Sequence, residues 1–178
     1  MNDTEIVRIP SERVNTVLGR GGSTKKRIER KCNVELEVDS DGSIQITGNS
    51  SEVFFAKDVV KAIGRGFRAD IALRLLDNEY VLYIISLKEV VGSDKAITRV
   101  KGRVIGEEGS IKGQIEHATD SYICVHGNTI TIIARIDTME HVKEAIGMLV
   151  NGARHSSVLK YLGKVRREIY QQRLRNRI

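Results

Sequence analysis

Residues 18–29 read Leu-Gly-Arg-Gly-Gly-Ser-Thr-Lys-Lys-Arg-Ile-Glu, and a similar stretch returns at residues 105–116 as Ile-Gly-Glu-Glu-Gly-Ser-Ile-Lys-Gly-Gln-Ile-Glu. Superposing Gly19 on Gly106 gives an offset of 87 residues and also brings Glu29 onto Glu116. Each copy has aliphatic residues before a Gly-x-x-Gly segment and a helical pattern after it. The chain is therefore predicted to be built from two copies of one unit.

The spacing of the glycines suggests a phosphate-binding turn. Glycine carries no Cβ penalty at positive φ, so two glycines three residues apart allow the backbone to turn sharply. Ser23 and Ser110 follow the second glycine, and serine is a favoured helix N-cap. The next helix would then present its N–H groups and the positive end of its dipole to a phosphate. For the motif alone, a purely structural corner between two helices is the alternative interpretation.

The repeated motif resembles the loop of the KH RNA-binding module. Residues 5–9 alternate as a strand before the first loop, and residues 34–38 and 43–47 alternate as a strand pair after it. A helix capped by Ser50 or Ser51 would follow, which gives the order β-α-α-β-β-α. Only one strand fits before Gly19, so the type I arrangement is favoured. The fold class is expected to be α+β, with two tandem type I KH domains, each a three-stranded antiparallel sheet packed on helices.

Residues 80–87, 122–125 and 129–134 supply the strands of the second copy, and its last helix is expected to be capped by Asp137. We expect a first KH domain at 1–67, a helical linker at 68–78, a second KH domain at 79–153 and a basic C-terminal helix at 154–178. This last segment has a net charge of +7, whereas the whole chain has +6. The basic residues are thus concentrated there and in residues 20–31, which favours a polyanionic partner.

Phosphate contacts are expected at both loops and at the first turn of the helix that follows each. The candidate residues are Gly19, Arg20, Gly21, Gly22, Ser23, Lys25 and Lys26 in the first copy, and Gly106, Glu107, Glu108, Gly109, Ser110 and Lys112 in the second. The first loop has the more favourable charge. In the second, two glutamates would repel phosphate, and Lys101, Arg103 and Lys112 are expected to offset them. Alternatively, the second copy serves as a scaffold or as a protein-docking surface.

In a KH module the loop holds the backbone of about four single-stranded nucleotides, and the bases lie in a groove beside it. The candidate aliphatic lining is Val17, Leu18, Ile28, Val34 and Leu36 in the first copy, and Val104, Ile105, Ile115 and Ile123 in the second. Core packing is the competing interpretation of each of these residues. An aromatic content of 4% argues against folds that stack bases on aromatic rings.

Four longer segments resemble archaeal members of the Dim/Pno family of ribosome-assembly KH proteins. They are residues 62–67, 72–77, 101–106 and 151–158. The resemblance implies binding of single-stranded small-subunit rRNA near its 3′ end during pre-rRNA processing. It also implies two protein partners, the Nob-type assembly endonuclease and the α subunit of archaeal initiation factor two. The chain departs from the family at Ser110, Ile111 and Gly113, and its first loop is intact where eukaryotic relatives have a degenerate one. Which copy makes the main RNA contact is left open.

No catalytic triad, paired-carboxylate cleft or P-loop is evident in the sequence, so we expect no enzymatic activity, cofactor or metal. Cys32 and Cys124 are expected to be reduced packing residues in a cytoplasmic protein. Two rival functions are compatible with the sequence. One is a protein-interaction adaptor in which the KH folds act as scaffold and the basic C-terminal segment holds RNA, and the other is a nuclease subunit.

Overall fold

The computed structural model describes residues 2–175 and divides into two compact units, Met1–Leu82 and Tyr83–Ile178. The first unit contains β1 (Asn2–Arg8), a short 3-10 turn at Ser11–Arg13, α1 (Val14–Leu18), η2 (Arg20–Gly22) and α2 (Ser23–Cys32). It continues with β2 (Glu35–Val38), β3 (Ser43–Asn49) and α3 (Ser50–Gly64), and then with α4 (Ala69–Ala72) and η3 (Leu73–Leu76). The predicted order β-α-α-β-β-α is confirmed.

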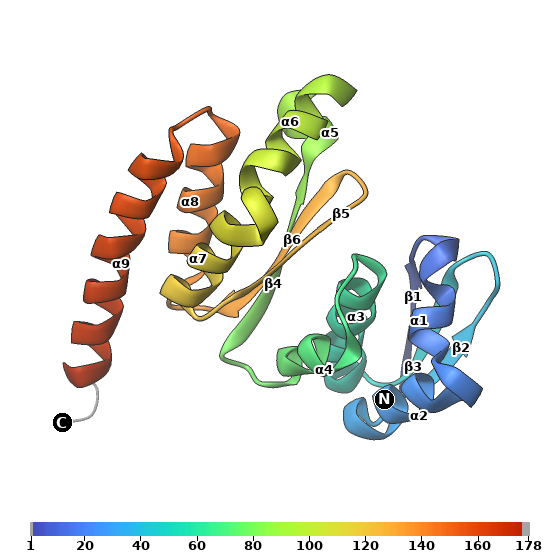
Figure 1. The fold of residues 1–178 in the computed structure, drawn as a ribbon. Coiled ribbons are helices and arrows are strands. Elements are labelled where there is room, and N and C mark those ends of the chain that lie inside the picture. Colours follow the sequence, from blue (N-terminus) through green and yellow to red (C-terminus); the bar gives the residue numbers. More distant parts are fainter. Residues whose placement is uncertain (1, 176–178) are drawn as a thin grey trace. The chain divides into compact units, whose positions relative to one another are not determined.

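The first sheet is antiparallel with strand order β1-β3-β2, and its helices pack on one face (Figure 1). Alternate residues of β3 point into the core because side chains in a strand alternate between its two faces. Ile44 pairs with Val7 on one side and with Val38 on the other, and it is fully buried. Ile28 of α2 and Ile63 of α3 are also fully buried. The period-2 pattern read from the sequence thus marks the core face of this sheet.

The second unit has the same plan with additions. It is formed by β4 (Tyr80–Ser86), α5 (Leu87–Val91), α6 (Asp94–Ile105), η4 (Glu107–Gly109), α7 (Ser110–Thr119), β5 (Tyr122–His126), β6 (Thr129–Arg135), α8 (Met139–Val150) and α9 (His155–Arg175). The sheet order is β4-β6-β5, and the division between the units falls inside β4. Helix α5 was not predicted. Its five residues are too few for a helical period to be recognisable in the sequence.

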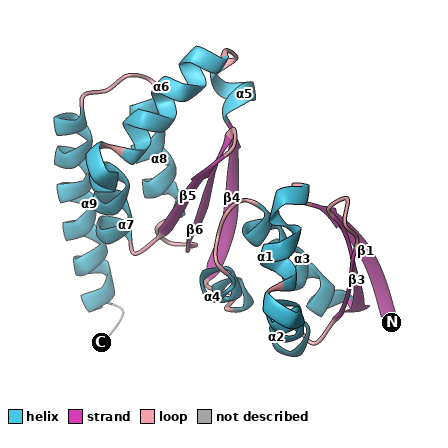
Figure 2. Cartoon of the chain, turned by 45° about the vertical axis from the view of Figure 1, so that its right-hand side comes forward, coloured by secondary structure: helices cyan, strands magenta, loops and turns pink. Residues whose placement is uncertain are grey.

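The C-terminal helix α9 lies outside α7 and α8, on the side away from the second sheet (Figures 1 and 2). Four of its aliphatic side chains are buried at helical spacing, namely Val158, Leu162, Val165 and Ile169. The predicted C-terminal helix is confirmed, and it is a packed layer of the second unit.

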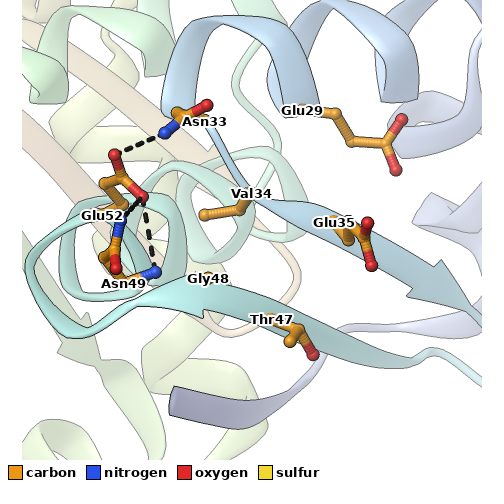
Figure 3. Close-up of a pocket in the computed structure, with 8 residues that line it drawn as sticks. All are labelled: Glu29, Asn33, Val34, Glu35, Thr47, Gly48, Asn49 and Glu52. Atoms are coloured by element: carbon orange, nitrogen blue, oxygen red, sulfur yellow. Dashed lines mark hydrogen bonds between the residues drawn. The ribbon is translucent and has the colours of Figure 1, made fainter. Parts of the chain in front are cut away.

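Two predicted helix caps outside the Gly-x-x-Gly loops are wrong. Helix α3 is capped by Asn49, whose side chain and that of Glu52 form a capping box. Glu52 also accepts a 2.6 Å hydrogen bond from Asn33 Nδ2 (Figure 3), and this bond lowers the pKa of Glu52. Helix α8 begins after Thr138, because Asp137 instead pairs with Arg135 Nε at 3.3 Å. Asn49 thus caps α3 with its side chain, whereas the N-cap residue of α8, Thr138, makes no side-chain cap bond.

Candidate nucleic-acid interface

The two Gly-x-x-Gly loops have nearly the same backbone conformation. Gly19 has φ 70° and ψ 174°, and Gly106 has φ 73° and ψ 175°. Gly22 and Gly109 are both left-handed, with φ 77° and 78°. Each loop is one 3-10 turn that connects two helices, α1 to α2 and α6 to α7. The offset of 87 residues found in the sequence is therefore also a structural equivalence.

The first glycine of each loop lies against the first turn of the next helix. A Cβ at Gly19 would come within 2.3 Å of Thr24 Oγ1, and a Cβ at Gly106 within 2.6 Å of Ile111 Cγ1. No heavy atom lies within 4 Å of the Cβ position at Gly21, Gly22 or Gly109. The first glycine is thus required for packing, whereas the later residues of the loop form an open surface that a ligand backbone can approach closely.

The predicted serine caps are not formed. Ser23 and Ser110 are the first helical residues of α2 and α7, and the N-caps are Gly22 and Gly109. The left-handed second glycine takes the cap position because it also completes the turn. Both serines are exposed beside the loop. The start of each helix still faces the loop, so the positive end of its dipole would still favour a bound phosphate.

Three basic side chains around the first loop are exposed, those of Arg20, Lys26 and Arg27. Within residues 2–175, no hydrogen bond or ion pair engages their charged groups. Lys25 is different, because its Nζ lies 3.4 Å from Glu29 Oε1 on the same helix. The first loop therefore keeps three cations available for an anionic ligand.

The cations expected to offset the charge of the second loop are engaged elsewhere. Lys101 Nζ donates to the Gly127 carbonyl at 2.8 Å. Arg103 donates to the carbonyl oxygens of Leu149, at 3.0 Å, and Ala153, at the C-terminal end of α8. Lys112 Nζ lies 3.1 Å from Glu116. Glu107 and Glu108 are exposed at the second loop, whereas the nearby cationic groups are held by backbone carbonyls and, for Lys112, by a carboxylate.

Both copies contain a carboxylate whose role the sequence did not predict. Glu29 Oε1 accepts the backbone N–H of Leu36 at 3.0 Å, and Glu116 Oε1 accepts that of Ile123 at 2.7 Å. Each N–H belongs to a strand at the edge of its sheet, β2 or β5. The signal was present in the sequence, since Glu29 and Glu116 are in register between the copies. These glutamates join the loop-following helix to the edge strand.

Most of the aliphatic residues proposed to line a base groove are buried in the core. They are Val17, Ile28, Val34, Leu36, Val104, Ile115 and Ile123, all of them at most 6% exposed. Leu18 and Ile105 are partly exposed, and each immediately precedes the first glycine of its loop. Of the proposed lining, Leu18 and Ile105 therefore contribute the apolar surface beside the two loops.

No three His, Cys, Asp or Glu side chains within residues 2–175 come together as a metal-binding group. No helix in the same range has the length and apolar character to cross a membrane. Neither Cys32 nor Cys124 forms a disulfide, and burial raises the pKa of Cys32 to about 11. A hollow of about 310 Å³ beside β2 and β3 is lined by polar residues that include Glu29, Glu35 and Glu52 (Figure 3).

Each copy and the chain as a whole are similar to known KH-domain proteins. Residues 81–167 match the model of a eukaryotic type KH domain, type I, of the PNO1 second-domain class, and residues 4–62 match the general KH domain. A KH domain-containing protein of Methanocaldococcus jannaschii is 41% identical over 95% of this chain and 77% of its own length. The pre-rRNA-processing protein PNO1 of Chaetomium thermophilum is 32% identical over 76% of this chain, which spans about half (54%) of that relative.

A similar solved structure is that of the complex of initiation factor a/eIF2alpha, aDim2p and rRNA from Pyrococcus horikoshii. The match has a TM-score of 0.88 and 35% identity, and it covers 94% of this chain and 96% of that chain. The fold of two type I units and a C-terminal helix is thus consistent with the family of these relatives. The chain belongs to the archaeal Dim/Pno family of KH-domain proteins.

Proposed function

We propose that this protein binds single-stranded small-subunit rRNA near its 3′ end and acts in pre-rRNA processing and small-subunit assembly. The observation that carries the proposal is the pair of open Gly-x-x-Gly loops at the starts of α2 and α7, on a chain of the Dim/Pno family. The names of two relatives support it, since one is a pre-rRNA-processing protein and another forms a complex with rRNA. The protein acts by binding and performs no catalysis.

The two loops would contribute unequally to binding. At the first loop, Arg20 and Lys26 carry positive charge to the backbone of the RNA, and the glycines let phosphates approach the start of α2. At the second loop, Glu107 and Glu108 leave backbone N–H groups as the phosphate ligands. Leu18 and Ile105 would contact the first base or sugar beside each loop. The first copy thus supplies most of the salt-dependent affinity, and the second adds contacts that depend less on salt.

The test is the affinity for an RNA that matches the mature small-subunit 3′ end, compared with a scrambled RNA of equal length over a salt series. Selective binding that survives high salt indicates that base edges are read. Equal binding to both RNAs, with a steep loss in salt, would reduce the interaction to phosphate contacts and refute the rRNA role.

Loop variants locate the contact within the chain. Arg20→Asp and Gly21→Asp should weaken RNA binding at least tenfold, and Arg20→Asp should lower the salt slope by about 1. Arg30→Asp makes the same change of charge on an exposed residue further along α2 and serves as the control. If both loop variants bind RNA like the control, the first loop does not hold the phosphates.

The adaptor function remains the second candidate, favoured by the six basic side chains of α9. In that case RNA would be held by α9, and the loop variants would leave binding unchanged.

The partners implied by the family are the initiation factor α subunit, which is present in the complex of a relative, and an assembly endonuclease. A cleavage assay with divalent metal separates both candidates from a nuclease subunit, since each predicts intact RNA. The proposed location is the cytoplasm.

A further inference from the structure

Helix α9 has a second apolar stripe that the fold leaves uncovered. Leu159, Tyr170 and Leu174 are 42%, 65% and 46% exposed. Together with Gly163 they recur at positions i, i+4, i+11 and i+15, so they share one face of the helix. This face is distinct from the one that packs against α7 and α8. Surface leucines scattered singly need no explanation, but a stripe along one helix face does.

The exposed stripe borders a hollow of about 650 Å³ between α9 and the last turn of α7. The floor contains Ala118 and the mostly buried Ile169. The hollow belongs entirely to the second unit, and it lies at the end of α7 away from the Gly-x-x-Gly loop. It is therefore separate from the proposed phosphate site.

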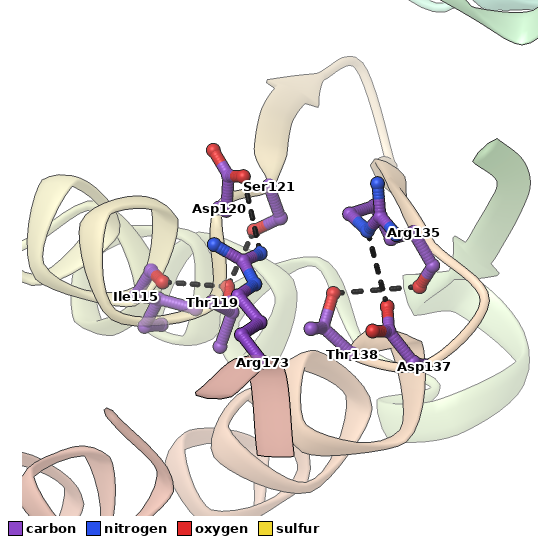
Figure 4. A network of polar contacts seen from close by, with 8 residues as sticks. All are labelled: Ile115, Thr119, Asp120, Ser121, Arg135, Asp137, Thr138 and Arg173. Atoms are coloured by element: carbon purple, nitrogen blue, oxygen red, sulfur yellow. Dashed lines mark hydrogen bonds and ion pairs between the residues drawn. The ribbon is translucent and has the colours of Figure 1, made fainter. Parts of the chain in front are cut away.

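Three arginines, Arg166, Arg167 and Arg173, line the hollow and give it a positive rim. Arg173 Nη2 lies 3.3 Å from Asp120 Oδ2 across the hollow (Figure 4), and Arg167 Nε donates to the Gly163 carbonyl at 3.2 Å. No described partner neutralises Arg166 within residues 2–175. The rim is thus partly fixed in place and retains net positive charge.

The geometry and the charge together limit what can cover this surface. The sixteen residues from Leu159 to Leu174 are joined by fifteen steps of 1.5 Å, so the stripe is about 22 Å long, which corresponds to four turns of a partner helix. A Cβ at Gly163 would meet no atom within 4 Å, so a partner backbone can come close at that point. A second copy is disfavoured, because α9 carries six basic side chains against Glu168 alone and would repel itself. RNA could pair with the arginines but would leave both leucines uncovered.

We propose that the groove between α7 and α9 docks an acidic amphipathic helix of a partner protein. The apolar face of that helix would cover Leu159, Tyr170 and Leu174, and its flanking carboxylates would face the arginine rim. Tyrosine and arginine are the residue types that most often dominate the energy of protein interfaces. The groove would therefore let the protein hold a partner while its loops bind RNA.

The test uses a synthetic peptide of about 16 residues, long enough to match the stripe, with leucine at every third or fourth position and glutamate beside it. A peptide of identical composition in scrambled order is the reference, and binding is followed by fluorescence anisotropy with the full chain. The ordered peptide should bind at least tenfold more tightly than the scrambled one. The double variant Tyr170→Ala/Leu174→Ala should remove this preference and leave the melting temperature unchanged, because both side chains are exposed.

A matched pair of charge variants separates the groove from the general charge of α9. Arg166→Ala/Arg167→Ala changes the rim, whereas Lys164→Ala/Arg175→Ala removes the same charge from a face of the helix that points away from the stripe. Only the first pair should weaken the peptide. Equal losses for the two pairs, or equal binding of ordered and scrambled peptides, would overturn the proposal. So would a groove variant that impairs binding of a twelve-nucleotide oligouridine and spares the peptide, since the groove would then be an RNA site.

Discussion

Glu108 has a left-handed backbone conformation, and the equivalent residue of the first loop, Gly21, is a glycine. Its φ is 51° and its ψ 27°, whereas Gly21 has φ 59° and ψ 28°. A left-handed conformation costs a non-glycine residue about 1–2 kcal/mol. The second loop thus keeps the shape of the first at some expense in stability, because the flanking Gly106 and Gly109 fix the turn on both sides.

We predict that Glu108→Gly raises the free energy of unfolding by about 0.5–1 kcal/mol, since the relief of left-handed strain exceeds the extra chain entropy of glycine. Denaturant unfolding of the second unit measures the change. The same variant removes a negative charge and should strengthen RNA binding.

Two controls accompany this substitution. Glu107→Gly removes the same charge at a residue outside the left-handed region and should not stabilise the protein. Gly21→Glu should destabilise the first unit by a similar amount to the gain at the second loop. A stabilisation by Glu107→Gly as large as that by Glu108→Gly would mean that charge, and not backbone strain, is the cause.

Among the elements, the edge strands β2 and β5 each donate one backbone N–H to a glutamate on a helix. Glu29 on α2 and Glu116 on α7 each accept a hydrogen bond from a backbone N–H of the strand. Each also forms an ion pair with a lysine of its own helix. An edge strand has backbone groups without a strand partner, and each carboxylate satisfies one of them. A hydrogen bond of this kind to a charged acceptor contributes about 1–3 kcal/mol.

Removal of the carboxylate should therefore loosen the edge strand locally. In Glu29→Ala we expect the Leu36 amide to exchange with solvent at least tenfold faster, and the protein to lose about 1 kcal/mol of stability. Amide exchange followed by NMR measures both effects. Glu37→Ala, on an exposed residue of the same strand, is the control, and unchanged exchange at Leu36 in Glu29→Ala would show that the bond carries no protection.

The sequence predicted those elements whose pattern is long enough to repeat. The sheet strands, the helices after each loop and the C-terminal helix followed from periodicity, because burial enforces the same period. The short helix α5 did not follow from periodicity, because five residues are too few to repeat the pattern. The N-cap positions Asn49 and Thr138 were not predicted either, because several neighbouring polar residues could occupy each of them. The site was predictable in its loops but not in its cations, because the reach of Lys101 and Arg103 is decided by carbonyls distant in the sequence.

At the scale of the whole molecule, α9 is part of the core of the second unit. Four buried aliphatic side chains, at about 1.5–3 kcal/mol each, contribute about 6–12 kcal/mol, which is comparable to the total stability of a typical domain. A chain that ends at residue 153 should therefore have an unfolded second unit and a folded first unit. A two-dimensional amide NMR spectrum should show dispersed signals for residues of the first unit only.

A chain that ends at residue 172 provides the comparison for this truncation. It loses Arg173 and Arg175 but keeps the buried stripe from Val158 to Ile169, so both units should remain folded. If the shorter chain also gives dispersed signals from the second unit, then α9 is a detachable appendage and its buried face contributes little.

The equal backbones of the two loops also bear on how a duplicated gene can diverge. A mutation at Gly19 or Gly106 drives a side chain into the next helix, so either copy would be lost with it. A mutation at the position of Gly21 meets open space and costs only modest strain, as Glu108 illustrates. The charge of the loop can therefore drift while its shape is inherited, and one of two redundant binding sites can acquire a new preference without passing through an unfolded ancestor.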